Sequence, residues 1–291
     1  MSTDAEFLGL RQTGEPGGFE FEVESHLARH DGHLYGGTAI AVSVATSEIV
    51  TERNALWMTT QFVATAPPQE TISVTTEILA PGRRTNQVRV TGTDSAGRTM
   101  FASLGATGVQ RPDGSFDGFD TMPQVSPPGE SEPDVTPFGS MLRRAGIEFE
   151  LPVEARHLGF TQVIEFREPE IYSHPDPGPG RMCFWVRRND DEPITLATAA
   201  FMADMVPMSV ASAAGFVGGG ISLDNTIRAA QFDETRWILI DMRPHIVVGD
   251  YGHGSVLIWS ESGRLLAHAG QTCSLLRFTG SDFQKVAKGA S

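Results

Sequence analysis

Cysteine is scarce in this 291-residue chain, which contains only Cys183 and Cys273. The two positions lie far apart and no Cys-x-x-Cys pair is present, which excludes a disulfide framework. We therefore expect two buried free thiols in a reducing cytoplasm. Long apolar runs are missing too: no stretch of 18 apolar residues occurs, and the acidic start from Met1 to Glu6 does not resemble a secretory signal. We expect no membrane span and a cytoplasmic location.

Positive charge is also in short supply. The chain has 22 Lys and Arg against 36 Asp and Glu, a formal net charge of −14. Nucleic acids and anionic membranes require a basic face, so neither is expected as a partner. A few arginines can still form a local site for a small anionic ligand, and Arg83-Arg84 is the best local candidate.

Motifs of several enzyme classes are absent. His26 and His30 have i, i+4 spacing, but no carboxylate or cysteine joins them at metal-ligand spacing. Gly36-Gly37 and the run from Gly218 to Gly220 lack the Lys and the strand–helix context of a phosphate loop. No Gly-x-Ser-x-Gly elbow of the serine hydrolases is present. We expect neither a metal nor a cofactor.

The first half of the chain has the pattern of one helix followed by strands. Residues 38–50 are small or apolar, which predicts a buried central helix lying close to a sheet. Before it, Phe19, Phe21 and Val23 alternate with glutamates, as in an edge strand. After it, segments with period-two patterning and turn residues between them predict strands at 56–65, 71–79, 85–93 and 99–109. One helix and an antiparallel meander make an α+β arrangement.

The second half repeats this order. A segment rich in Pro, Gly and acids, about residues 110–139, predicts a linker, and we place the domains at residues 1–125 and 126–291. Gly97-Arg98 and Gly263-Arg264 each form a turn before a final strand, which supports an internal duplication. Besides one helix, the second half has strand candidates at residues 149–153, 161–166, 182–187, 223–232, 237–244, 254–259 and 264–278.

The helix-length apolar run from Thr195 to Met208 contains one carboxylate, Asp204. Its neighbours three and four positions away are apolar, so no polar stripe on the helix accounts for it. Such a carboxylate lies in a wet cleft with polar neighbours, has a shifted pKa, or is an exposed acid at a helix end. Pro207 predicts a bend beside it. The helix of the first half has no equivalent acid.

Two more polar residues stand out in the second half. Gln271 lies among small and apolar residues of the last strand, where an unpaired amide would be costly to bury. Aligned on the Gly-Arg turns, Gly105 falls opposite it. Ser222 begins a strand after three glycines and is either a turn hydroxyl or a site residue. Asp224, expected on the same strand face, is the rival carboxylate. Because only one half keeps polar groups, we expect that half to carry the chemistry.

Taken together, these features resemble the acyl-CoA thioesterase II (TesB-like) family. The resemblance runs from about residue 15 to 278 and rests on these features: Gly36-Gly37 before a helix, a strand ending in Thr65-Ala66-Pro67-Pro68, the duplicated half, Ala203-Asp204, the run Ser222 to Thr226, and Ala269-Gly270-Gln271. It implies a double hotdog fold, in which two sheets each wrap around one central helix. It also implies a catalytic set of Asp204, Ser222 and Gln271, with Ser where the family commonly has Thr, and a homo-oligomer.

The resulting hypothesis is a thioesterase that hydrolyses fatty acyl-CoA to free acid and CoA. Asp204 would act as general base on a water held with Ser222 and Gln271, or would attack the thioester directly. The expected substrate contacts are Gly36, Gly37, Phe201, Met205 and Met208, with Arg83 and Arg84 on the CoA phosphates. The alternatives for these residues are ordinary core packing and solvated turn arginines.

Two other functions remain open on the same fold. One is a non-catalytic protein that binds acyl-CoA or an acyl carrier, in which Asp204 is structural. The other is a hotdog hydratase or dehydratase. That chemistry prefers a His near the working Asp, and no His lies between His174 and His245 in the sequence, which lowers this alternative.

Overall fold

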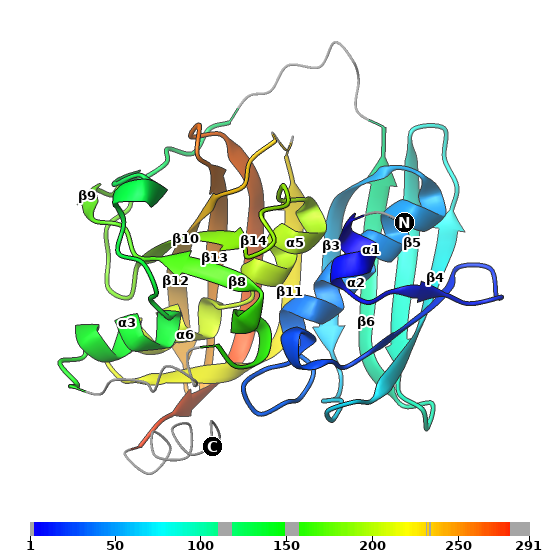
Figure 1. Ribbon diagram of the computed structural model, residues 1–291, viewed down its shortest axis with the longest axis horizontal. Coiled ribbons are helices and arrows are strands. Elements are labelled where there is room, and N and C mark those ends of the chain that lie inside the picture. The colour runs from blue at the N-terminus through cyan, green and yellow to red at the C-terminus, as the bar shows by residue number, and fades with distance from the viewer. Residues whose placement is uncertain (1–2, 110–117, 149–156, 231, 233, 280–291) are drawn as a thin grey trace.

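The computed structural model describes residues 3–109, 118–148, 157–230, 232 and 234–279. Two halves lie side by side, each with a central helix or helix pair against strands (Figure 1). The described elements of the first half are α1 (Thr3–Phe7), β1 (Arg11–Gln12), β2 (Gly18–Glu22), the 3₁₀ helix η1 (Ser25–Leu27), α2 (Gly36–Thr51), β3 (Asn54–Phe62), β4 (Thr71–Ala80), β5 (Thr85–Thr93) and β6 (Thr99–Gly108).

The second half begins with short elements and continues with long strands. Its described elements are β7 (Gln124–Val125), η2 (Pro128–Glu130), α3 (Pro137–Arg144), η3 (Gly159–Gln162), β8 (Ile164–Arg167), β9 (Ile171–Ser173), β10 (Met182–Arg188), α5 (Leu196–Met202), α6 (Val206–Ala213), β11 (Gly218–Ala229), β12 (Ile238–Val248), β13 (Tyr251–Ser260) and β14 (Leu265–Arg277).

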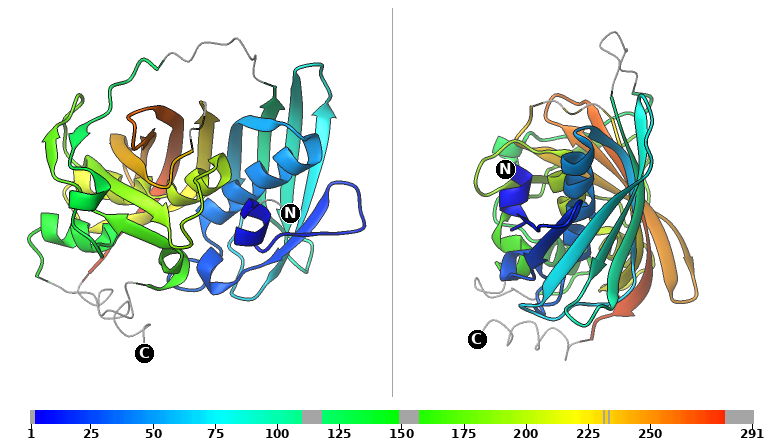
Figure 2. Two further views of the ribbon diagram at one scale, coloured as in Figure 1. Left: turned by 45° about the horizontal axis from the view of Figure 1, so that its top comes forward. Right: turned by 90° about the vertical axis from the view of Figure 1, so that its right-hand side faces the viewer.

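A single sheet joins the two halves. Its order within the described residues is β1-β2-β4-β5-β6-β3-β11-β14-β13-β12-β10-β8. In the middle β3 and β11 pair antiparallel, and the hydroxyls of Thr59 and Thr226 form a hydrogen bond of 2.9 Å across that junction. The helices lie against one face of this curved sheet (Figure 2). The predicted α+β double hotdog fold is therefore confirmed.

The central helix of the first half is buried on nearly all sides. Its residues from Gly37 to Ser47 are buried, and most of them are small, so the helix packs closely against the strands. Two of its internal hydroxyls bond within the helix: Ser43 donates to the carbonyl of Ala39 at 2.8 Å, and Thr46 to that of Val42 at 2.9 Å. The expected central helix at 38–50 is confirmed, beginning two residues earlier.

Most predicted strands exist, with shifted ends. The largest correction concerns Gly218 to Gly220, which belong to strand β11 and not to the turn before it. Residues 159–162, which overlap the candidate at 161–166, form a 3₁₀ helix before β8 begins at Ile164. The candidate at 149–153 lies outside the described residues.

The predicted linker contains more structure than its composition indicated. In its described part, Met122 and Val125 pack against a cluster formed by Trp185, Trp237 and Trp259 on the sheet. The indole N–H of Trp185 donates to the carbonyl of Ser126 at 2.8 Å. Residues 118–131 thus close part of the core of the second half, while the domain boundary itself stays a prediction.

The segment Leu196–Ala213 passes a test for a membrane-spanning helix by length and composition, but 83% of it is buried inside the fold. It is divided between α5 and α6. Its apolar character is that of a core element.

We predict that Ile40→Ala in α2 lowers the free energy of unfolding by about 2–5 kcal/mol, because Ile40 is fully buried and the helix cannot shift to fill the cavity. The matched control is Ile78→Ala in β4, where the side chain is 39% exposed; there we expect a much smaller change. Urea unfolding of both variants measures the difference. Equal losses for the two variants would contradict the role of α2 as the centre of the core.

Candidate active site

A break between two helices carries Asp204. The sequence predicts one bent helix from Thr195 to Met208, but α5 ends at Met202 and α6 begins at Val206. Pro207 is the second residue of α6, where its missing N–H costs nothing, so it starts a helix here and does not bend one. The break frees the main-chain carbonyl of Asp204, which accepts a hydrogen bond of 3.2 Å from the hydroxyl of Tyr35.

The side chain of Asp204 meets the two residues predicted to accompany it. Gln271 donates through Nε2 to Oδ1 of Asp204 and also to Oγ of Ser222, the latter at 2.5 Å. Asn225 donates to the same Oδ1 at 3.0 Å. Asp204, Asn225 and Gln271 are each less than one-tenth exposed. The structure therefore brings Asp204, Ser222 and Gln271 together; their catalytic roles stay a prediction.

Burial sets the protonation of Asp204. It raises the pKa of this carboxyl to about 6, although hydrogen bonds from Asn225, Gln271 and the backbone N–H of Gly37 lower it. The carboxylate also lies at the N-terminal end of α2, where the helix dipole favours negative charge. At neutral pH the group is mostly ionised and weakly solvated, the state of a general base.

Gly36 and Gly37 allow the carboxylate to approach the helix this closely. A Cβ atom at Gly36 would collide with Oδ2 of Asp204, and one at Gly37 would collide with the carbonyl oxygen of Phe201. The first half therefore supplies the helix end that faces the carboxylate. The interpretation that the second half alone carries the chemistry is incomplete.

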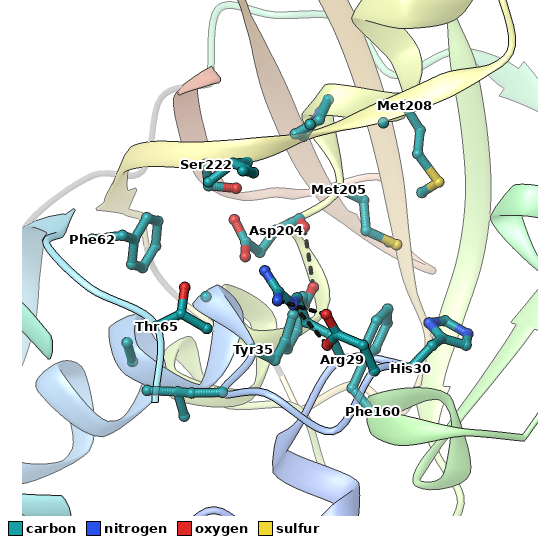
Figure 3. A pocket seen from close by; sticks show the side chains of 18 of the residues that line it. Arg29, His30, Tyr35, Phe62, Thr65, Phe160, Asp204, Met205, Met208 and Ser222 are labelled. Carbon is teal, nitrogen blue, oxygen red and sulfur yellow. Dashed lines mark hydrogen bonds and ion pairs between the residues drawn. The ribbon is translucent and has the colours of Figure 1, made fainter. Parts of the chain in front are cut away.

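A cavity of about 790 Å³ opens in front of these groups (Figure 3). It forms where β3 and β11 separate. Their pairing ends at Gln61 and Asp224. Beyond this point, residues 62–65 on the β3 side and residues 219–223 of β11 line the opening. Most of the lining is apolar. Arg29, His30 and Asp31 add polar groups to the lining, and Arg29 pairs with Asp31 at 2.8 Å.

The predicted acyl contacts are partly in the cavity. Met205, Met208 and Asp204 line it (Figure 3), and Gly36 lines it too. Phe201 does not: it is fully buried beneath the site, and its ring packs edge-on against Tyr35 at a centroid distance of 5.3 Å. Phe201 is a core residue that supports the α5–α6 break.

Arg83 and Arg84 lie away from the cavity, contrary to their expected contact with CoA phosphates. Both are exposed in the β4–β5 turn. The neighbouring carbonyl of Gly82 accepts a hydrogen bond of 2.9 Å from Arg53, which follows the C-terminal end of α2. The cavity is at the other end of that helix, which at 16 residues is about 24 Å long.

Sequence reasoning missed Asn225 and misplaced Asp224. A bulge between Ser222 and Asp224 shifts the strand, so that Asn225 and not Asp224 shares the inner face with Ser222. The side chain of Asp224 is not directed at Asp204 and accepts a hydrogen bond of 2.8 Å from the backbone N–H of Thr272. The only sequence signal for Asn225 was its place in the run Ser222 to Thr226, since a bulge cannot be read from alternation.

One group of side chains away from the cavity has the composition of a metal site. His174, Cys183 and Asp241 place one ligand atom each within 4.8 Å of one another. However, Nδ1 of His174 accepts the backbone N–H of Asp176, so Nε2 carries the proton and donates to Asp241 at 3.0 Å. Arg243 holds the other oxygen of Asp241 at 2.8 Å. These contacts satisfy the group without a cation.

Comparisons with known proteins agree with this geometry. A family model described as the acyl-CoA thioesterase N-terminal domain matches residues 26–107, and the model for the C-terminal domain matches residues 134–275. No curated protein gives a significant match.

Several solved structures resemble the whole chain. A candidate thioesterase from Novosphingobium aromaticivorans DSM 12444 is 29% identical, with a TM-score of 0.76 over 93% of this chain and 98% of that one. A hot dog fold protein from Alicyclobacillus acidocaldarius is 19% identical, with a TM-score of 0.76 over 96% and 100%. The acyl-CoA thioesterase II TesB2 from Mycobacterium marinum is 16% identical, with a TM-score of 0.69 over 96% and 99%. The last two support the fold alone.

We predict that Asp204→Asn stabilises the protein at pH 7 by about 2–3 kcal/mol. An acid whose pKa is higher in the folded state than in the unfolded state binds its proton more tightly when folded. Stability therefore falls as pH rises from about 4 to about 6 and stays low above that range. Melting temperatures of wild type and variant at pH 4 and pH 7 measure this effect.

The control for this prediction is Asp250→Asn, which changes an exposed carboxylate in the β12–β13 turn and should leave the melting temperature almost unchanged. If Asp204→Asn destabilises the protein equally at pH 4 and pH 7, burial of the ionised Asp204 carboxylate does not lower the stability of the wild type.

Proposed function

The chain belongs to the acyl-CoA thioesterase family, and from that premise we propose that it hydrolyses a fatty acyl-CoA thioester to a free acid and CoA. The observation that carries this proposal is the buried Asp204 carboxylate, hydrogen-bonded by Gln271 beside Ser222 at the wall of a largely apolar cavity. Thioester hydrolysis needs an activated water, a site for the oxyanion and a slot for the acyl chain.

In the proposed mechanism Asp204 acts as general base. A water bound between Asp204 and Ser222 gives its proton to the carboxylate as its oxygen attacks the thioester carbon. The amide of Gln271 donates to Ser222 Oγ, so the serine hydroxyl hydrogen remains available to hold that water. Collapse of the tetrahedral intermediate then breaks the C–S bond, and the proton on Asp204 passes to the leaving thiolate.

The start of α2 is the best-placed oxyanion site. Gly36 is the first residue of this helix and lines the cavity, and the N–H of a first helical residue has no partner inside the helix. An oxyanion there would also be stabilised by the helix dipole. This places the negative charge of the intermediate beside the glycine that touches Asp204.

The cavity offers two different surroundings for the substrate. The apolar lining residues Met205, Met208 and Phe278 suit the acyl chain, while the polar lining residues Arg29, His30 and Asp31 suit the pantetheine arm. We propose that water and acyl-CoA suffice for the reaction, with no further cofactor. The two free buried thiols support a cytoplasmic location, and a homo-oligomer stays a prediction.

A hydratase or dehydratase deserves a test for one reason. His30 lines the same cavity as Asp204, although it lies far from it in sequence, so the sequence argument against a nearby His does not hold. Burial lowers the pKa of His30, which keeps it neutral near pH 7. Incubation with a 2-enoyl-CoA distinguishes the two reactions when absorbance and free thiol are both followed: hydration removes the conjugated absorbance without releasing a thiol, whereas hydrolysis releases one.

We predict that the wild type releases CoA thiol from acyl-CoA, and that Asp204→Asn and Ser222→Ala lose activity, the former by about 10²- to 10⁴-fold. The activity of the wild type should fall on the acid side with a midpoint near the pKa of about 6 of Asp204, because the protonated acid is no base. Thiol release followed with a chromogenic disulfide from pH 5 to 8 checks both statements.

The matched control is the double variant with Arg83→Ala and Arg84→Ala. Both residues are exposed and lie at the far end of α2, so their replacement should leave the rate unchanged. Equal rates for Asp204→Asn and wild type would remove Asp204 as the base. No release with any chain length would favour an acyl-CoA-binding protein.

A second prediction concerns the three glycines that open β11. A Cβ atom at Gly218 or Gly220 would collide with a backbone carbonyl, of Leu276 and Ser274 respectively, so packing requires both glycines. A Cβ at Gly219 would only touch the ring of Phe278 at 3.5 Å, which is ordinary contact. Gly219 lines the cavity. The space that a side chain at this position would fill is therefore part of the cavity.

We therefore expect Gly219→Val to reduce activity on long acyl-CoAs by about tenfold or more while activity on short ones is kept, since a few lost methylene contacts are worth that factor. The control is Gly129→Val, where nothing lies near the added side chain. A chain-length series measures kcat/KM for both variants. A uniform loss at all lengths would place the acyl chain elsewhere in the cavity.

A further inference from the structure

Among the described residues, no cation pairs with the buried carboxylate of Asp204, whose side-chain partners are amides. Within the described part of the chain, the groups that lower its pKa are all neutral: the amides of Asn225 and Gln271 and the N–H of Gly37. Arg29 lines the same cavity but pairs with Asp31. The balance between carboxylate and carboxylic acid therefore depends on a few uncharged donors, and each of them matters.

Of these donors, Asn225 has the most specific role. Gln271 divides its amide between Asp204 and Ser222, and Gly37 donates from the backbone. The side-chain amide of Asn225 makes its hydrogen bond in the described structure to Asp204 alone, at 3.0 Å, and the residue is only 2% exposed. Nothing else in the described structure explains a buried amide at this position.

The strand register aims both amides at one oxygen. Asn225 lies directly opposite Gln271 in the pairing of β11 with β14, so the two side chains leave the same face of the sheet next to each other. Both donate to Oδ1 of Asp204. Oδ2 lies instead over Gly36, a residue of the cavity wall. The two oxygens of one carboxylate thus have different surroundings.

We propose that Asn225 is a positioning residue that binds Oδ1 of Asp204, keeps the carboxylate ionised, and leaves Oδ2 facing the cavity to take the proton of the attacking water. This inference rests on the proposed function of the same site. It does not depend on which acyl-CoA is the substrate, because Asn225 itself does not line the cavity.

Few other titratable groups act on this carboxylate. Tyr35 from the start of α2 and Cys273 from β14 are within electrostatic reach of Asp204, and burial raises the pKa of both, that of Cys273 to about 11, so both stay neutral in the working range. His30, Arg29 and Asp31 line the cavity without contributing to the pKa shift of Asp204. A change at Asn225 should therefore appear as a shift of a single titration.

The test compares wild type with Asn225→Leu, which removes the donor at similar volume. The acid limb of kcat/KM should move to higher pH by about one unit or more, because an unpaired buried carboxylate binds its proton more tightly. Part of the lost rate should return above the new midpoint. A ¹³C NMR titration of the Asp204 carboxyl carbon should show the same upward shift without any substrate.

The matched control is Thr226→Val, one residue further along the same strand. Thr226 lies at the β3 junction, where its hydroxyl bonds Thr59, and its replacement should leave the acid limb in place. If Asn225→Leu folds but its limb and its ¹³C titration coincide with those of wild type, Asn225 does not position Asp204. A rate loss equal at every pH has the same meaning.

A second variant covers the case in which Asn225→Leu does not fold. Asn225→Asp keeps the shape but replaces the donor by a second acid, and two adjacent carboxyls share a proton, which should move the limb upward even further. An unmoved limb overturns the proposal. If the wild type hydrolyses no thioester, the proposed function fails, while the NMR titration of Asp204 still decides the role of Asn225.

Discussion

The site depends on holding one carboxylate in a buried place without a cation. Asp204 projects from the break between α5 and α6 and is paired with neutral groups only. Because each donor satisfies only part of the desolvation cost, several have to converge. They come from β11, β14 and the first turn of α2, so the carboxylate can be stabilised only after both halves have joined in one sheet.

The same requirement explains why the duplicated fold has a single such site in the described residues. Where the second half has Gln271, the first half has Gly105, and a Cβ atom there would collide with the backbone of Trp57 and the thioether of Met58. In the first half, the buried hydroxyls of Ser43 and Thr60 both bond Ser103 at 2.8 Å. An amide side chain like that of Gln271 therefore does not fit at position 105.

The sequence predicted what depends on residue type and missed what depends on register. Asp204 and Gln271 stood out because polar side chains in apolar segments need a partner, and the resemblance added Ser222. The bulge after Ser222, which brings in Asn225 and removes Asp224, follows no alternation rule. Arg83 and Arg84 were proposed as phosphate contacts because of their charge. Only the fold determines that their hairpin turn lies at the end of α2 opposite to the cavity. Phe201, one turn from Asp204, proved to be core.

Burial has two opposite consequences at this site, and the neutral donors set the balance between them. Removing water from Asp204 raises its pKa to about 6, which makes the carboxylate a stronger base than a solvated aspartate and brings its pKa closer to the working pH. Further burial or fewer donors would leave the acid protonated and inactive near pH 7. More donors or an arginine in their place would lower the pKa toward that of a free aspartate and weaken the base. Two side-chain amides and one glycine N–H hold Asp204 between these limits, at a cost in stability that the rest of the core must offset.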